Sequence, residues 1–171
     1  SRIDSVVNWF SMPKKQRPNL CLLYFHEPDH TGHETGPKSN ETAMMVTKID
    51  SLFGILITKL EQLPIAKNLN ILVVSDHGMT EISSERTIDL SNHIETSKMK
   101  QEGSGPYSLL YDMDKNEIGN IVDKLNTVPK ISAYAKKDIP DRYHFKHHHR
   151  IKDVLVIADE GWYINNQAIS S

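Results

Sequence analysis

Hydrophobic and polar positions recur along the chain with two different periods. Apolar residues fall at helical spacing over residues 2–10 and over 42–63. In the longer stretch the apolar stripe consists of Met45, Ile49, Leu52, Phe53, Leu56, Ile57 and Leu60. Short apolar runs over 19–25 and 70–74 are instead typical of strands buried within a sheet. The order strand, long helix, strand predicts a right-handed crossover unit of a parallel sheet.

The second half of the chain has a different rhythm. Residues 80–103 are polar with few periodic signals, which predicts a long connection containing at most one short element. After it we expect a helix over 114–125, capped by Asp112 or Asp114. Strands are predicted over 107–111, 131–135, 154–158 and 162–164. The pattern therefore indicates an α/β fold with an α/β core over 1–103 and a small α+β lobe over 104–171.

The composition argues against nucleic-acid binding, a membrane-spanning helix and an internal disulfide in this chain. The 171 residues are 38% hydrophobic and 25% charged, as in an ordinary globular protein, and the net charge of −2 argues against nucleic-acid binding through a basic face. The longest apolar runs are far shorter than the ~20 residues of a membrane helix, so membrane attachment is expected only through segments outside this chain. Cys21 is the sole cysteine, which excludes an internal disulfide. Because the predicted helix already begins at Arg2, we expect the natural chain to start further upstream.

A sequon, Asn40-Glu41-Thr42, lies in a predicted loop. It would suit a secreted protein, but such triplets also arise by chance and do not assign a compartment. The histidine run 147–149 is interpreted as a solvated loop.

A carboxylate and an imidazole follow the first predicted strand of the core. Asp29 and His33 are four residues apart, and Pro28 and Gly32 predict a tight loop around them. Taken alone, the pair has an ordinary interpretation as a turn-capping aspartate and an exposed histidine. His26, just before the loop, is a candidate for orienting a ligand from outside its coordination shell.

A second such pair, Asp76 and His77, ends the second predicted strand directly before Gly78. In parallel sheets chemistry gathers beyond the carboxyl ends of the strands, so both pairs are expected at one edge. Carboxylate oxygen and neutral imidazole nitrogen suit Zn²⁺, and less selectively Mn²⁺ or Fe²⁺. Two metals a few ångströms apart would clamp an in-line phosphoryl displacement. The joint placement of the pairs favours a two-metal site over the ordinary interpretation.

The motifs resemble those of a known family. Its first motif is matched by Tyr24, Pro28, Asp29, Gly32, His33, Gly36 and Pro37, and its second by the run SDHGM over 75–79. In this pattern the chain is similar to the ectonucleotide pyrophosphatase/phosphodiesterase family, within the alkaline-phosphatase-like superfamily. The resemblance implies a central fragment of the catalytic domain: part of the superfamily's α/β sheet with flanking helices, plus the small lobe.

The resemblance also implies a chemistry. Asp29 and His33 would be ligands of one zinc, and Asp76 and His77 of the other, so the implied cofactors are two Zn²⁺. The implied substrate is a small-molecule nucleotide or another phosphodiester. The family's threonine nucleophile and remaining metal ligands fall outside this chain, which therefore contains no catalytic nucleophile and is expected to be inactive alone. The implied location is extracellular, or membrane-anchored with an extracellular catalytic domain.

Three alternatives remain open at the level of sequence. The full-length protein could cleave choline phosphodiesters or lysophospholipids, since the family covers both substrate classes. It could instead be a non-catalytic ectodomain that retains part of the metal site. A phosphomutase or sulfatase relative is a third alternative, against which the loop from Pro28 to Pro37 argues.

Overall fold

The computed structural model describes residues 1–165, and the chain divides into two compact units at the bond between Met79 and Thr80. The expected boundary at 103/104 differs from this division. Residues 80–103, predicted as a connection, contain strand β1 (Thr87–Asp89) and strand β2 (Lys100–Glu102). Because β1 and β2 pair with strands later in the chain, this segment belongs to the second unit. Within residues 1–165 no helix is long and apolar enough to cross a membrane.

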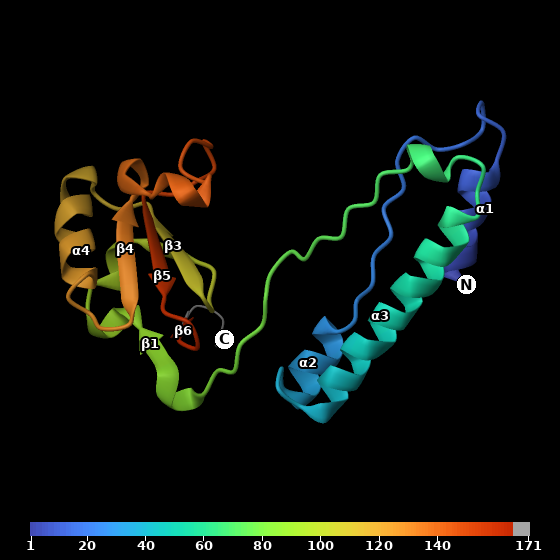
Figure 1. Ribbon diagram of the computed structural model, residues 1–171. Helices are drawn as coiled ribbons and strands as arrows, with labels where there is room; N and C mark the ends of the chain where they lie inside the picture. Colours follow the sequence, from blue (N-terminus) through green and yellow to red (C-terminus); the bar gives the residue numbers. More distant parts are fainter. Residues whose placement is uncertain (166–171) are drawn as a thin grey trace. The chain divides into compact units, whose positions relative to one another are not determined.

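The first unit is built on three helices: α1 (Arg2–Ser11), α2 (Asp29–Thr35) and α3 (Asn40–Glu61). Figure 1 shows α1 beside the later half of α3, and α2 beside its beginning. A capping box between Ser1 and Asp4 starts α1. The core between α1 and α3 is formed by Ile3, Val6, Leu56 and Leu60. The helices predicted over 2–10 and 42–63 are thus confirmed to within two residues.

The two strands predicted in this unit are not formed. Residues 19–25 and 70–74 run extended but pair with no other described segment. Side chains in both remain open to solvent: Leu22 is 87% exposed and Leu72 84% exposed. A strand needs a neighbour to bond its N–H and C=O groups, and none of the described residues supplies one. The predicted parallel crossover sheet is therefore absent from the described residues.

The second unit contains a four-stranded antiparallel sheet in the order β2-β3-β5-β4. Its other strands are β3 (Tyr107–Tyr111), β4 (Ile131–Ala135) and β5 (Val154–Ala158). Helix α4 (Ile118–Leu125) packs on one face of the sheet, as Figure 1 shows. The fully buried side chains include Leu90, Leu110, Leu125, Val154, Val156 and Ile164. These elements confirm the lobe predicted over the later part of the chain.

Three further features belong to the second unit. Strand β6 (Tyr163–Asn165) pairs in parallel with β1 as a separate two-stranded sheet. At the end of α4 the Asn126 side chain donates to the Ala133 carbonyl at 3.0 Å, and its Oδ1 accepts from the Ala133 N–H at 2.8 Å. This two-way bond ties α4 to β4. Asp114 caps the 3-10 turn Lys115–Glu117 that leads into α4, through a bond from the Asn116 N–H, whereas α4 itself begins after Glu117 without a side-chain cap from any described residue.

Candidate metal centre

The first predicted pair lies on one face of a short helix rather than in the loop that the sequence predicted. Residues 29–35 form α2, so Asp29 and His33 are one turn apart. The Nε2 of His33 lies 3.5 Å from the Oδ1 of Asp29. That Oδ1 is shielded from solvent and accepts no hydrogen bond from any described residue. A buried acceptor without a donor is rare in proteins, and a cation can occupy such a position.

Glu27 holds the start of α2, a role that sequence reasoning missed. Its carboxylate accepts from the Thr31 N–H at 3.1 Å and from the Thr31 hydroxyl at 2.8 Å. Burial raises the pKa of Glu27, but the two bonds from Thr31 and the nearby His26 and His30 outweigh it, and the pKa lies below its usual value. The signal in the sequence was an acidic residue just ahead of the helix with threonine four positions later.

The second pair is oriented by its own backbone. The Nδ1 of His77 lies 2.9 Å from the Gly78 carbonyl oxygen, which can only accept, so Nδ1 carries the proton. In the neutral ring the Nε2 lone pair is then free, the arrangement in which histidine binds metals. This Nε2 lies 3.6 Å from the Oδ2 of Asp76. The Ser75 hydroxyl fixes the same turn by donating to the His77 carbonyl at 2.5 Å.

The two pairs lie close to one another in the first unit. The pKa of His77 is raised, first by the Gly78 carbonyl, then by the Asp76 carboxylate and also by Asp29, against the effect of burial. The geometric evidence that the pairs are neighbours is steric: a Cβ on Gly32 would lie 2.6 Å from the Sδ of Met79. Helix α2 and residues 76–79 are therefore packed together.

The donor set fits zinc but is incomplete. Two carboxylates and two imidazoles are ligands that Zn²⁺ binds well. Within residues 1–165, however, no three His, Cys, Asp or Glu side chains converge on one point. Each pair would thus supply two ligands of an ion that usually takes at least three from protein. All four side chains are at least 47% exposed, so further ligands and substrate have access to them.

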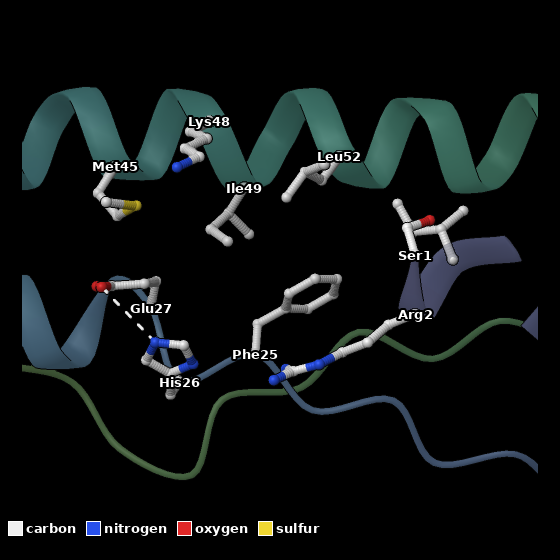
Figure 2. Close-up of a pocket in the computed structure, with 10 residues that line it drawn as sticks. Ser1, Arg2, Phe25, His26, Glu27, Met45, Lys48, Ile49 and Leu52 are labelled. Atoms are coloured by element: carbon white, nitrogen blue, oxygen red, sulfur yellow. Dashed lines mark ion pairs between the residues drawn. The ribbon is translucent and has the colours of Figure 1, made fainter. Parts of the chain in front are cut away.

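A separate hollow of about 340 Å³ lies in the same unit. Figure 2 shows Met45, Ile49 and Leu52 of α3 facing Phe25 across it. His26 and Glu27 form an ion pair at one side, with 3.9 Å between Nε2 and Oε1. None of the four predicted ligands lines this hollow, so it is not the candidate metal centre.

A comparison with known families gives a match over nearly the whole chain. Residues 1–170 match the sequence profile of the family described as type I phosphodiesterase / nucleotide pyrophosphatase. The chain belongs to this family. The match covers both pairs and both units, and it confirms the resemblance inferred from the two motifs.

Curated relatives in the type I phosphodiesterase family are named as hydrolases. Human ectonucleotide pyrophosphatase/phosphodiesterase family member 5 is 32% identical over 164 residues, which are 95% of this chain and 34% of the relative. Human bis(5'-adenosyl)-triphosphatase ENPP4 is 34% identical over 165 residues, covering 95% of this chain and 36% of the relative. The chain thus spans about a third of the length of these relatives.

Solved structures of the family share the fold. An inactive form of murine ectonucleotide pyrophosphatase/phosphodiesterase 5 in complex with AMP has a TM-score of 0.76 and 34% identity, covering 95% of this chain and 43% of that one. The human protein has a TM-score of 0.75 and 32% identity, covering 96% and 44%. These similarities confirm the predicted α/β fold class for this phosphodiesterase family chain.

Proposed function

We propose that the full-length protein hydrolyses phosphodiester or pyrophosphate bonds of nucleotides with two zinc ions. The observation that supports this most directly is the shielded Oδ1 of Asp29, which lies beside His33, has no donor and belongs to the pair next to His77. The relatives point the same way. One is named a bis(5'-adenosyl)-triphosphatase, and the murine relative was solved with AMP.

Each pair would hold one ion: Asp29 and His33 the first, Asp76 and His77 the second. When bound, zinc supplies Lewis-acid polarisation of a phosphoryl oxygen and lowers the pKa of a bound water. The chain itself supplies orientation. The Gly78 carbonyl keeps the proton on Nδ1 of His77 and leaves Nε2 free to bind. The threonine nucleophile is proposed to come from a segment outside this chain, so these residues position the reaction and do not attack phosphorus.

The proposed substrate is a small nucleotide, and the proposed location is extracellular or on the outer face of a membrane. The open site suits a soluble ligand, since the four ligand side chains are 47–86% exposed. A rattlesnake relative is named a venom phosphodiesterase, and a human relative is named an ectonucleotide pyrophosphatase/phosphodiesterase family member. Both names support an extracellular location for this protein. For the same reason we propose that the full-length protein is a glycoprotein.

The test compares variants of two candidate ligands with a variant of a neighbour on α2. Asp29→Asn and His77→Ala are made in the full-length protein, with His30→Ala as the control, because His30 is an exposed histidine of α2 that is not one of the four candidate ligands. Zinc content is measured by plasma mass spectrometry, and turnover with a chromogenic nucleotide phosphodiester and with bis(5'-adenosyl) triphosphate.

Each ligand variant should lose about one zinc per chain and at least ~10²-fold in turnover, because one ion of the clamp is removed. The control should keep both zinc content and turnover. Wild-type zinc content and turnover in Asp29→Asn and His77→Ala would overturn the assignment. If the variants lose zinc but the wild-type protein hydrolyses neither substrate, the proposed nucleotide chemistry is wrong and the ligand assignment stands.

A further inference from the structure

The chain contains one Asn-x-Thr sequon, and the structure places it in the first turn of α3 rather than in the loop that the sequence predicted. Helix α3 begins at Asn40 because Ser39 caps it: the Ser39 hydroxyl oxygen accepts from the Thr42 N–H at 3.1 Å. The sequon therefore occupies the end of α3 that packs against α2, the helix that carries Asp29 and His33.

Asn40 has no structural task at this position. Its side chain is exposed, and no hydrogen bond joins it to another described residue. The capping role that asparagine often plays is taken by Ser39. Because the Asn40 side chain is exposed, a bulky substituent on its amide nitrogen would extend into solvent without disturbing the backbone hydrogen bonds of α3.

Thr42, in contrast, is fully engaged. It is only 9% exposed. Its hydroxyl donates to the Gly36 carbonyl at 2.9 Å and accepts from the Ser39 hydroxyl at 3.0 Å. Sequon recognition uses this hydroxyl, and in the folded chain it is neither accessible nor free. A modification at Asn40 must therefore be made before α3 docks on α2.

We propose that Asn40 carries an N-linked glycan, attached while the chain is still unfolded in the secretory pathway. In this step the amide nitrogen of Asn40 bonds to the anomeric carbon of an oligosaccharide. The bond from that carbon to the pyrophosphate of a lipid-linked donor breaks, and the amide proton leaves with the pyrophosphate. The inference rests on the proposed extracellular location and is independent of the proposed hydrolysis.

The full-length protein is secreted from animal cells and treated with peptide N-glycosidase in ¹⁸O-water, and the tryptic peptide 39–48 is analysed by mass spectrometry. Wild type should show Asn40 converted to labelled aspartate in more than half of the molecules. Thr42→Ser keeps the hydroxyl and should keep the label, whereas Asn40→Gln should abolish it. Secreted wild-type protein with an unlabelled peptide would overturn the glycan alone, and a protein retained in the cytosol would overturn the location as well.

A second measurement tests the timing. Unglycosylated full-length protein, folded in vitro, and a free peptide of residues 36–46 are offered to purified oligosaccharyltransferase with its lipid-linked donor. The peptide should be modified and the folded protein at least tenfold less, because Thr42 is engaged in the latter. Equal modification of both would refute attachment before folding. Nucleotide hydrolysis by Asn40→Gln, measured in parallel, should equal that of wild type.

Discussion

A methyl group added to Gly32 tests whether the two motifs pack together. In the middle of a helix, glycine to alanine ordinarily stabilises by about 0.5–1 kcal/mol. Here the new Cβ would lie 2.6 Å from the Sδ and 3.1 Å from the Cε of Met79. These atoms are the flexible end of the Met79 side chain, and turning that end away costs about 0.5–1.5 kcal/mol. Gly32→Ala should therefore lose most of its usual gain and lie between about 0.5 kcal/mol stabilising and about 1 kcal/mol destabilising, whereas in a Met79→Ala background it should stabilise by the full amount.

The assay is a double-mutant cycle in the full-length protein, with free energies of unfolding from denaturant titration and zinc affinity measured alongside. The expected coupling between Gly32 and Met79 is about 1 kcal/mol, against less than about 0.5 kcal/mol for independent sites. Gly54→Ala on α3, where a Cβ would contact nothing within 4 Å, is the matched control and should stabilise in both backgrounds. If Gly32→Ala stabilises equally with and without Met79, residues 76–79 do not rest on α2, and the shared metal centre loses its geometric basis.

Three further outcomes are expected. Hydrogen bonds from Lys59 and from the Ser1 cap hold the pKa of Asp4 well below its usual value, so the ionised Asp4 carboxylate stabilises the fold fully above about pH 4 and progressively less as the pH falls. Asp4→Asn should lower the thermal midpoint at about pH 7 and have a steadily smaller effect below about pH 4; an effect that does not change with pH would refute this. Asn126→Ala should lower the free energy of unfolding by about 1–3 kcal/mol, because it leaves the N–H and the carbonyl of Ala133 unpaired. An unchanged midpoint of thermal unfolding would refute this. Val73 is 72% exposed in this chain, so Val73→Lys should leave the free energy of unfolding of this chain unchanged. In the full-length protein the same change should cost more than about 2 kcal/mol, because a lysine would be buried in a strand. Equal effects in both proteins would count against burial of residues 70–74 in a strand.

Much of the fold was readable because its signals are local. Helices α1, α3 and α4 and strands β3 to β5 each carry a hydrophobic period that their own neighbours satisfy. Strands β1 and β2 are three residues long and carry no apolar run, so the pattern could not reveal them. The runs 19–25 and 70–74 carry a strand signal, but a strand is a property of two segments, and no described segment pairs with them.

The metal-ligand role of the four candidate residues stays a prediction, and the local structure around the first pair differs from the one predicted. Asp29 and His33 were expected in a tight loop because Gly32 normally interrupts a helix. The structure gives another reason for the glycine: Met79 occupies the space that a side chain would need. That reason depends on a residue 47 positions away, and no local pattern can convey it. The hydrogen bonds that the Glu27 carboxylate accepts from Thr31 were missed for a similar reason, because they depend on a helix that had not been predicted.

The division of the chain after Met79 places the four candidate ligands and the interior of the later unit on different sides of one bond. All four candidate ligands precede that bond, and their unit has a hydrophobic core of its own between α1 and α3. A substitution that loosens the interior of the later unit therefore leaves in place the contacts that hold the earlier unit together.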